Sequence, residues 1–346
     1  MIRVGPRNLI SDVAGVLVGN AEDEGLRSGT TVVLAEGPMT AAVDVRGGGP
    51  GTRETDALDP SCLVEAVDAV VLSGGSAYGL DAAGGVMSWL GARGRGFKVG
   101  DAVIPIVPSA ILFDLLNGGD KDWGETPPYR ALGTRAAESA AADFALGNAG
   151  AGLGAVAGGV KGGLGSASFV FEGSDGTELT VGALAVANPF GATVMPGTRT
   201  FWAWALERNE ELGGQAPPTG PLTEPELDYG SEGSLAANTT LAVVATDAVL
   251  TKAQAGRIAI MAQDGIARAI RPVHTPFDGD TVFVVSTGAR ALGGPPGDPL
   301  GDIAKLGMLA ADCTARAIAR GVYEAEGLGA YPGYRAPGKQ DSGTNP

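Results

Sequence analysis

The sequence predicts a mixed α and β fold in one domain over residues 1–346. Runs of β-branched residues such as Gly29–Leu34 alternate with Gly-rich and Asp-rich turns in the first third of the chain, which is typical of paired strands. In the last third, apolar residues at helical spacing follow another β-branched run, Thr239–Thr246. The composition of 57 glycines, 44% apolar residues and 5% aromatic residues predicts closely packed layers around a sizeable core.

The first hundred residues predict strands, then a strand that enters a helix through a glycine turn. Val67–Leu72 runs into Ser73–Gly79 and a small-residue helix over Leu80–Gly91. Such a turn is a place where a ligand or an anion meets the backbone, or where a helix packs tightly on a sheet, and both interpretations stay open. Gly74, Gly75 and Tyr78 of this turn are candidate substrate-binding residues. The earlier expected elements are strands at Val13–Val18, Gly29–Leu34 and Thr40–Val45, and a Gly-rich loop at Arg46–Thr52.

The middle of the chain is mixed. It predicts an irregular strand containing Pro105, a short helix, a Trp-bearing loop and an Ala-rich helix, at Val103–Val107, Ser109–Leu116, Asn117–Tyr129 and Arg130–Leu146. A Gly-rich loop over Asn148–Ser166 then presents one cation, Lys161. It is not a P-loop, because Val160 follows its GxxxxG run and Gly follows Lys161. Lys161 is either an ordinary surface charge or a buried contact.

Two further strands are expected at Ser168–Phe171 and Thr180–Ala187. The second ends in Asn188-Pro-Phe-Gly191, so Asn188 projects from a strand end into a turn. An amide in that place can donate to an oxyanion, and it is equally a common place for a structural Asn. Residues 207–237, rich in Gly, Pro and Glu, predict a flexible linker.

After the linker the elements are sharper. Thr251 and Gln254 predict a capping box for a helix that presents one apolar face, with Ile258, Met261, Ile266 and Ile270. The segment His274–Asp280 is expected to be a turn before a strand at Thr281–Val285. Asp302 is expected to cap a last helix that runs through Arg320, with Arg316 and Arg320 in its final turn.

Charge and cysteine usage exclude several classes of function. The net charge of −15, with 39 acidic and 24 basic residues, argues against partners such as nucleic acid or an anionic membrane, and fits an amine-bearing substrate. Cys62 and Cys313 lie outside any CxxC pattern in apolar surroundings, so we expect buried free thiols in a reducing compartment. No apolar leader or stretch of about 18 apolar residues occurs, and we expect a cytoplasmic protein. No cofactor and no metal are expected.

The main candidate for a catalytic motif is Asn238-Thr239-Thr240, at the start of the strand that is expected after the linker. A Thr hydroxyl becomes a useful nucleophile when its own α-amino group, with a pKa of roughly 7.7–8.0, is free to act as the base. Freeing that amine requires cleavage of the Asn238–Thr239 bond, which the same hydroxyl can attack. The alternative is that two Thr at a strand start reflect β-propensity alone.

Three blocks connect this pattern with a known family. They are Gly-Gly-x-Ala-Tyr-Gly-Leu at 74–80, Lys-Gly-Gly-x-Gly-Ser-Ala-Ser at 161–168 and His-Thr-x-x-Asp-Gly-Asp-Thr at 274–281. Together they resemble the P1 or S58 peptidase family, which includes L-aminopeptidase/D-esterases, β-aminopeptidases and nylon-oligomer hydrolases. The resemblance implies a four-layer αββα sandwich, like the N-terminal-nucleophile hydrolases but differently connected. It also implies self-cleavage into chains 1–238 and 239–346, and a homo-oligomer, often a tetramer of processed pairs.

The resemblance also implies roles for individual residues in hydrolysis of small peptides, amino-acid amides or oligoamides. Thr239 matches the nucleophile, Lys161 the active-site lysine and Asn188 the amide near the oxyanion. Asp278 and Asp280 match an acidic pair that orients the N-terminal amine. One departure concerns substrate binding, because Phe113 stands where the nylon-oligomer branch has a Tyr near the substrate, so substrate preference is not carried over.

Three alternatives remain at this point. Asp278-Gly-Asp280 can be a metal site, although the chain has one His and no EF-hand spacing. A self-cleaving acyltransferase of the ornithine-acetyltransferase type uses the same nucleophile and differs in needing an acceptor amine. A non-catalytic Gly-rich protein that binds small molecules would stay a single chain.

Overall fold

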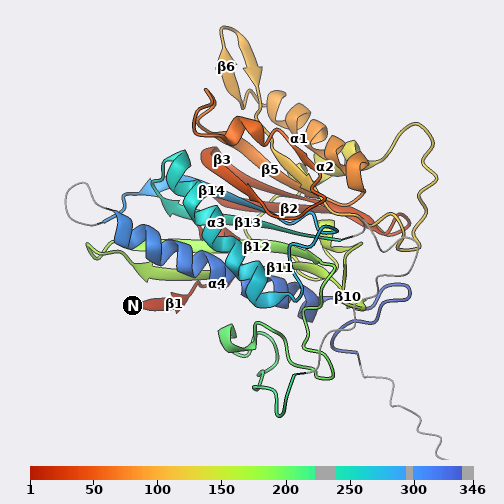
Figure 1. Cartoon of the computed structure of the whole chain (residues 1–346). Coiled ribbons are helices and arrows are strands. Elements are labelled where there is room, and N and C mark those ends of the chain that lie inside the picture. Colours follow the sequence, from red (N-terminus) through yellow and green to blue (C-terminus); the bar gives the residue numbers. More distant parts are fainter. Residues whose placement is uncertain (223–237, 294–298, 337–346) are drawn as a thin grey trace, which may run out of the picture.

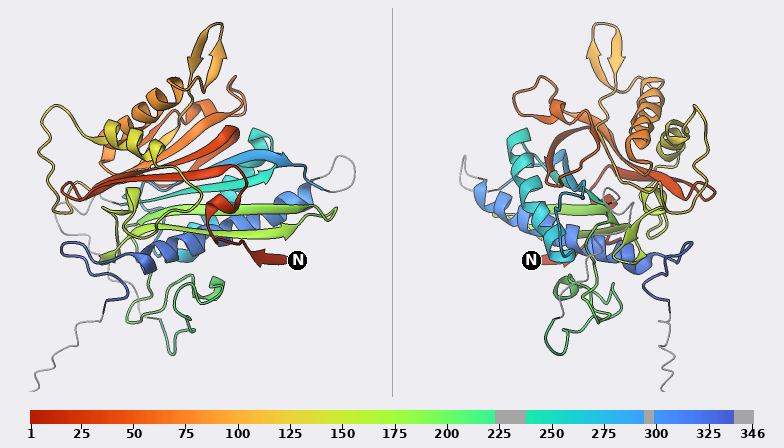
Figure 2. Two further views of the ribbon diagram at one scale, coloured as in Figure 1. Left: turned by 180° about the vertical axis from the view of Figure 1, so that it is seen from behind. Right: turned by 45° about the vertical axis from the view of Figure 1, so that its right-hand side comes forward.

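The computed structural model describes residues 1–222, 238–293 and 299–336. Figures 1 and 2 show two stacked sheets with a pair of helices on each outer face. The helices α1 and α2 cover one sheet, and α3 and α4 cover the other. Their bounds are Ala82–Gly91 for α1, Tyr129–Glu138 for α2, Lys252–Ala269 for α3 and Leu300–Glu324 for α4.

Ten of the strands in the described ranges form one continuous sheet, along the path β1-β11-β12-β13-β14-β3-β5-β8-β4 with β2 paired to β3. The pairs β13–β14 and β5–β8 are parallel and the other pairs on this path are antiparallel. The bounds are Ile2–Val4 (β1), Val16–Asp23 (β2), Ser28–Val45 (β3), Thr52–Arg53 (β4), Val67–Ser73 (β5), Ser109–Ile111 (β8), Gly163–Glu172 (β11), Glu178–Asn188 (β12), Thr239–Ala248 (β13) and Thr281–Arg290 (β14).

The long strand β3 joins the two sheets. Its first part, Thr30–Leu34, pairs with β2 and β5, and its last part, Thr40–Val45, pairs with β14. The pairing with β5 shifts register between Leu34 and Met39, where the chain passes from one sheet to the other. The two strands predicted at Gly29–Leu34 and Thr40–Val45 are therefore two ends of a single strand.

Three hydrophobic cores separate four layers. Along β13, Leu241 and Val243 point into the core between the sheets, while Ala242 and Val244 point into the core under α3 and α4. Along β5, Val70 and Leu72 face the core between the sheets, while Ala69 and Val71 face α1 and α2. This alternation is the period of two that a strand buried on both faces requires. It confirms the four-layer αββα sandwich.

The predicted helix over Ser109–Leu116 is wrong. Ser109–Ile111 is the strand β8, and the Leu112 N–H continues the pairing by donating to the Ser73 carbonyl at 2.9 Å. The apolar run Ala-Ile-Leu suits either structure, and pairing with the buried strand β5 decides between them. The predicted strand at Val103–Val107 is only partly present, because β7 (Ala102–Ile104) forms a hairpin with β6 (Phe97–Val99) that projects from the body (Figure 1).

Two segments differ from their expected extent. The Ala-rich helix predicted through Leu146 ends at Glu138, because Ala141 forms a two-way backbone bridge with Val18 of β2. The Gly-rich segment Asn148–Ser166 is only partly a loop. It contains the short hairpin of β9 (Val156–Ala157) and β10 (Val160–Lys161) and the start of β11.

The charged residues of the last helix have other places and partners than predicted. Asp302 does not cap α4; its carboxylate accepts the backbone N–H groups of Ser174 and Gly293, at 2.9 Å each. Arg316 lies in the middle of the helix and is fully buried, with Nε 2.5 Å from the Glu211 carboxylate. The ion pair with Glu211, and not an interaction with the helix dipole, thus explains why Arg316 can be buried in α4.

Glu211 belongs to the segment predicted as a linker. In its first part, the Glu207 carboxylate accepts the backbone N–H groups of Leu212, Gly214 and Gln215, and Leu212 is buried. Residues 207–215 are thus fastened to the body, whereas residues 223–237 lie outside the described residues. The Thr251–Gln254 capping box is present at the start of α3. Cys313 is buried as expected, but Cys62 is partly exposed, in a loop. No helix within the described ranges is long and apolar enough to cross a membrane.

Candidate active site

Thr239 begins β13 at the open end of the layer between the sheets. Because Leu241 and Val243 face the core between the sheets, the period of two places Thr239 on the same side. Asn188, the last residue of β12, pairs directly with Thr239 across the two antiparallel strands. Both residues are 3% exposed, so a polar pair lies at the edge of a dry core.

The Thr239 hydroxyl lies against the peptide bond that precedes it. Its Oγ1 donates to the Asn238 carbonyl oxygen at 2.5 Å. The backbone N–H of Gly279 donates to the same oxygen at 3.0 Å. A hydroxyl and a backbone N–H therefore donate to the same carbonyl oxygen. This carbonyl belongs to the Asn238–Thr239 peptide bond, which is predicted to be cleaved.

Asp278-Gly279-Asp280 runs parallel to Asn238-Thr239-Thr240, and the bridge between Asn238 and Asp278 is the first rung. The Asp280 Oδ1 accepts the Thr240 N–H at 2.7 Å. Its Oδ2 lies 2.7 Å from the His274 Nδ1 and accepts the His274 N–H at 3.1 Å. Asp280 therefore fastens the backbone beside Thr239 to the turn at His274.

Asp278 fastens the same turn to the loop after Asn188. Its Oδ1 accepts the Phe190 N–H at 3.0 Å, and its Oδ2 accepts the Thr275 N–H and hydroxyl at 2.9 and 2.6 Å. Burial raises the pKa of Asp278, and the charge of Asp280 raises it further. In the uncut chain both carboxylates hold backbone on either side of Thr239, and neither forms a hydrogen bond with its hydroxyl within the part that the structure describes.

The glycine loop Arg46–Gly49 contacts the backbone of Asp278 and Asp280. The sequence analysis did not assign this loop to the site. The Gly49 N–H donates to the Asp278 carbonyl at 2.8 Å, and the Arg46 N–H donates to the Asp280 carbonyl at 3.0 Å. A Cβ on Gly47 would lie 2.3 Å from the Asp278 carbonyl oxygen. The run Arg46-Gly-Gly-Gly indicated a loop, but nothing in it indicated which segment would lie against it.

Lys161 is a buried contact and not a surface charge. It is 1% exposed, and its Nζ donates to the Gly152 and Gly162 carbonyls at 2.7 and 2.8 Å. Burial lowers the pKa of Lys161 to about 7, against the opposing charge of Asp114. No hydrogen bond joins Lys161 to Thr239 among the described contacts.

Asn188 connects Lys161's hairpin with the residues predicted to bind substrate. Its Oδ1 accepts the Val156 N–H of β9 at 2.9 Å, and its Nδ2 donates to the Phe113 carbonyl at 3.2 Å. Phe113 thus contributes its backbone to the site. The amide is held from two sides, and both holders are backbone groups of other segments.

The glycine turn after β5 is tightly packed. Gly75 has φ +86°, and a Cβ on it would lie 2.0 Å from the Tyr129 ring. A Cβ on Gly74 would lie 2.1 Å from the Asp114 carboxylate. Tyr78 is 53% exposed and packs edge-on against Trp123. The turn therefore shows the close packing that was one of its two interpretations, and substrate binding by these residues stays a prediction.

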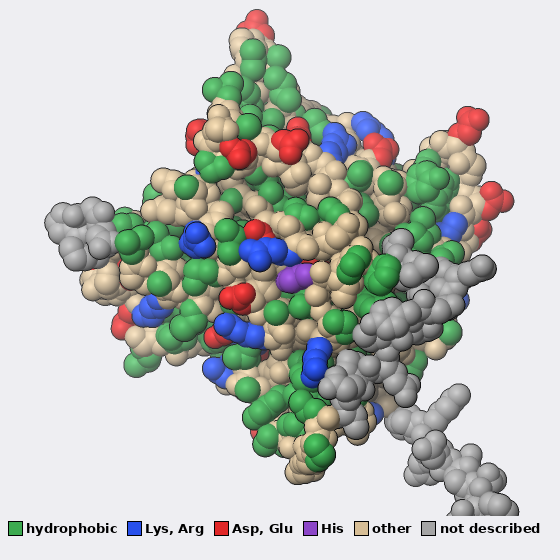
Figure 3. Space-filling model, in the orientation of Figure 1, with side chains coloured by type: hydrophobic (Ala, Val, Ile, Leu, Met, Phe, Trp, Pro, Cys, Tyr) green, Lys and Arg blue, Asp and Glu red, His purple; other side chains and the backbone are tan. Residues whose placement is uncertain are grey.

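The alternative of a metal site finds no support in the donor set. Hydrogen bonds from backbone and side-chain donors occupy the oxygens of Asp278 and Asp280. In the described ranges no group of three or more His, Cys, Asp or Glu side chains is arranged to hold a metal. Figure 3 shows the single histidine, His274, on a face where charges of both signs are interspersed.

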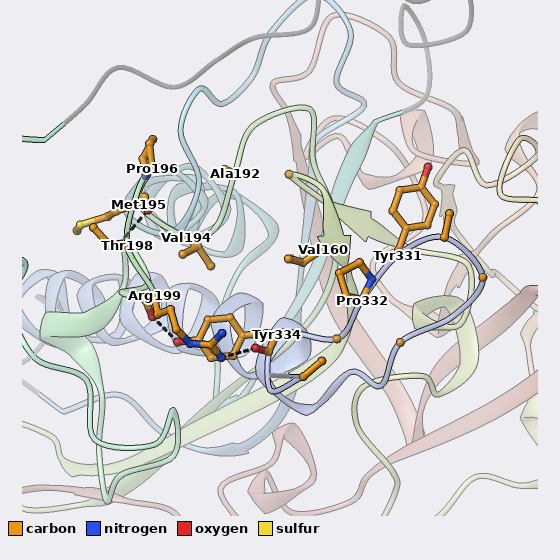
Figure 4. A pocket seen from close by; sticks show the side chains of 16 residues that line it. Val160, Ala192, Val194, Met195, Pro196, Thr198, Arg199, Tyr331, Pro332 and Tyr334 are labelled. Carbon is orange, nitrogen blue, oxygen red and sulfur yellow. Dashed lines mark hydrogen bonds between the residues drawn. The ribbon is translucent and has the colours of Figure 1, made fainter. Parts of the chain in front are cut away.

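A cavity of about 870 Å³ lies on the outer side of the β9–β10 hairpin (Figure 4). Its lining is mainly apolar and includes Val160, Met195 and Tyr331, and Arg199 donates to the Tyr334 carbonyl at its rim. Thr239 and Asn188 do not line it. The cavity is connected to the site through backbone, since the Lys161 N–H donates to the Pro332 carbonyl at 2.8 Å.

The chain matches a known protein family along most of its length. The model of peptidase family S58 matches residues 8–336. A Mycobacterium bovis protein named as an uncharacterized aminopeptidase is 43% identical over 344 residues, covering 95% of this chain and 97% of its own. A 6-aminohexanoate-oligomer endohydrolase of Kocuria is 30% identical over 333 residues, covering 89% and 84%.

A solved structure is also similar to this chain in its fold. The L-aminopeptidase D-Ala-esterase/amidase of Ochrobactrum anthropi, described as a variant of the Ntn hydrolase fold, superposes with a TM-score of 0.67 at 26% identity. The match covers 95% of this chain and 90% of that one. The family match over nearly the whole chain, the curated relatives and the shared fold together show that this chain belongs to peptidase family S58 and is a hydrolase.

Proposed function

We propose that this protein is a self-processing amidohydrolase or aminopeptidase with an N-terminal threonine nucleophile. The observation that carries the proposal is the meeting of the Thr239 hydroxyl and the Gly279 N–H at the Asn238 carbonyl oxygen. A nucleophile beside the carbonyl, with a donor already on its oxygen, is the arrangement that acyl transfer requires.

In self-processing, the Thr239 oxygen attacks the Asn238 carbonyl carbon and its proton leaves to a base. The carbonyl oxygen becomes an oxyanion on the Gly279 N–H, and the C–N bond then breaks so that the Thr239 nitrogen takes a proton. The product is an ester between Asn238 and the Thr239 oxygen. Water hydrolyses this ester, leaving a carboxylate on Asn238 and a free α-amine on Thr239.

The same site then serves amide substrates. The free Thr239 amine accepts the hydroxyl proton, the oxygen attacks the substrate carbonyl, and the amine of the leaving group departs with a proton. The Gly279 N–H, which the Asn238 carbonyl occupied before cleavage, is available for the substrate oxyanion, and the Asn188 amide lies across from Thr239. Each such donor is worth about 3–4 kcal/mol of transition-state stabilisation. Water completes the cycle by hydrolysing the acyl-enzyme.

Lys161 and the acidic pair adjust the charge of the site. A buried lysine with a pKa of about 7 can carry or release its proton near neutral pH. When protonated, it disfavours protonation of a nearby Thr239 amine, and Asp278 and Asp280 act in the opposite direction. The net charge of −15 favours substrates with a free amine. We propose small peptides, amino-acid amides or oligoamides as substrates, and a homo-oligomer of processed pairs as the working form.

The test is the intact mass of the purified protein under denaturing conditions, with N-terminal sequencing of each piece. We expect two chains, 1–238 and 239–346, the second beginning Thr-Thr-Leu-Ala. Thr239→Ala is expected to stay uncut and to lose hydrolysis of amino-acid p-nitroanilides and of 6-aminohexanoate oligomers, because both reactions need its oxygen.

The matched control is Thr240→Val. Thr240 is as buried as Thr239, and its hydroxyl has no hydrogen-bond partner in the described part of the chain. The isosteric change keeps the backbone N–H that Asp280 accepts. This variant is expected to process and to hydrolyse amides like the parent. A cut Thr239→Ala chain would remove Thr239 from the mechanism.

A further inference from the structure

Asp114 is a buried carboxylate that the mechanism above does not use. It is 3% exposed, and its Oδ1 accepts the Gly75 N–H at 2.8 Å. The Ser28 hydroxyl is the side-chain donor beside this carboxylate, and no lysine or arginine forms an ion pair with it among the described residues. Burying a carboxylate without a paired cation is costly, so a reason for the charge is expected elsewhere in the site.

One connection from Asp114 leads to Asn188 through the backbone of the preceding residue, Phe113. The Leu112 N–H donates to the Ser73 carbonyl, and the Asp114 carboxylate holds Gly75, so Phe113 is fixed between two bonds to the same turn. The Phe113 carbonyl in turn accepts from the Asn188 Nδ2 at 3.2 Å. Asp114 therefore stabilises the peptide group that orients the Asn188 amide.

The second connection leads to Lys161 across one turn of backbone. A Cβ on Gly154 would lie 2.3 Å from the Asp114 Oδ2, so the glycine allows the carboxylate to approach the Gly152–Gly154 turn. On that turn the Gly152 carbonyl accepts from the Lys161 Nζ at 2.7 Å. An anion and a cation thus lie near opposite sides of one glycine turn in a region from which water is excluded, where charges interact strongly.

We propose that Asp114 is a positioning residue of this active site, which fixes the carbonyl that orients Asn188 and supplies the buried anion that lies against the same glycine turn as Lys161. Both effects act on residues that are predicted to belong to the active site, Asn188 and Lys161. The consequence for catalysis rests on the proposed function. The electrostatic coupling itself does not, since it belongs to the folded uncut chain.

Other charged and titratable groups around the pair are few. Lys121 and the Tyr129 hydroxyl also interact with Asp114. Lys121 is half-buried, and burial lowers its pKa. Asp114 is the charged group that acts on Lys161 against its burial. Burial raises the pKa of Asp114, and the hydrogen bond from the Ser28 hydroxyl and the charge of Lys121 oppose that rise.

The experiment is a direct titration of Lys161 by NMR with lysine labelled at Cε. Thr239→Ala is used as the background so that every sample is the uncut chain. The protein has six lysines, and a Lys161→Met spectrum assigns the signal. The Lys161 midpoint is expected near pH 7 in the background protein. Asp114→Asn, which keeps the shape and the acceptor for Gly75, is expected to lower it by about one pH unit.

The matched control is Asp247→Asn. Asp247 is also buried, accepts one backbone N–H (from Thr180, at 2.8 Å) and has its pKa raised by burial, but it lies at the far end of β13. This variant is expected to leave the Lys161 midpoint unchanged. An unchanged midpoint in a folded Asp114→Asn protein overturns the proposal, since a merely structural Asp114 predicts that result.

The reciprocal titration covers the case in which Asp114→Asn does not fold. Coupling between two sites is mutual, so Lys161→Met must raise the Asp114 midpoint by the same amount. Asp labelled at Cγ reports it, and an unchanged Asp114 midpoint again overturns the proposal. In the processed enzyme, Asp114→Asn is further expected to move the Lys161 limb of the pH–rate profile to lower pH. If Thr239 proves not to be the nucleophile, the titrations keep their meaning.

Discussion

At the scale of single residues, the position of the Thr239 hydroxyl depends on the absence of a side chain at Gly279. A Cβ on Gly279 would lie 2.6 Å from the Thr239 Oγ1 and 3.3 Å from its Cγ2. Gly279→Ala must therefore displace the hydroxyl from the Asn238 carbonyl, although it retains the backbone N–H. A misplacement of about 1 Å costs roughly 100-fold in rate, and we expect processing to slow by about that factor. The measurement is the fraction of uncut chain against time after purification.

Gly49, in the loop that contacts Asp278 through its backbone, provides the comparison. A Cβ on Gly49 would meet only the Pro276 and Asp278 carbonyl oxygens, at 3.7 and 3.8 Å, which is ordinary contact. Gly49→Ala is expected to process at close to the parent rate. If Gly279→Ala also processed at that rate, the hydroxyl position described here would not be the reactive one.

At the scale of elements, α4 depends on a partner that is remote in sequence. Arg316 is fully buried, and the Glu211 carboxylate accepts from both its Nε and its Nη2. Glu211→Ala leaves a buried guanidinium without its counter-charge, and such losses cost about 3–5 kcal/mol. We expect that fall in the free energy of unfolding, measured by urea denaturation in the Thr239→Ala background so that a single chain unfolds.

The neighbouring Glu210 is the control for this change. It is exposed and makes no ion pair with a described residue, and Glu210→Ala is expected to change stability by less than about 0.5 kcal/mol. Equal losses in the two variants would mean that Glu211 acts through local turn structure and not through Arg316.

The same elements show what the sequence could and could not predict. The strand after Thr239 and the capping box at Thr251 were predicted because their causes are local: a β-branched run, and two side chains three residues apart. The site residues Thr239, Lys161, Asn188, Asp278 and Asp280 were named through family motifs, and the structure brings all but Lys161 into direct or one-residue contact around β13. Family motifs thus selected candidate residues that local patterns left ambiguous, and the catalytic roles of these residues stay predictions.

The misses have a common physical cause. Ser109–Ile111 became a strand and Arg316 a buried ion pair because of partners that lie 38 or more residues away in the chain, such as Ser73, the partner of Ile111, and Glu211. Asp114 was not singled out because a lone Asp in Phe-Asp-Leu has no pattern, and its meaning comes from the glycines that approach it. Periodicity carries no information about such contacts.

At the scale of the whole molecule, the proposed cut would leave two chains that share one sheet. In the strand order β12-β13-β14-β3, the two central strands belong to residues 239–346 and the flanking strands to residues 1–238. The helices α3 and α4 belong to the second piece and cover strands of both. Neither piece can bury its sheet edges and its apolar faces alone.

We therefore expect the two pieces to stay together as one folded particle. Native mass spectrometry should find them at a 1:1 ratio, and only denaturant should separate them. Residues 239–346 expressed alone, with Thr239 at the start, should be insoluble or unfolded by circular dichroism, because β13 and β14 would expose both edges. Co-expression with residues 1–238 should restore a soluble pair. Pieces that separate without denaturant would contradict a single domain, since the core between the sheets draws its residues from both sides of the cut.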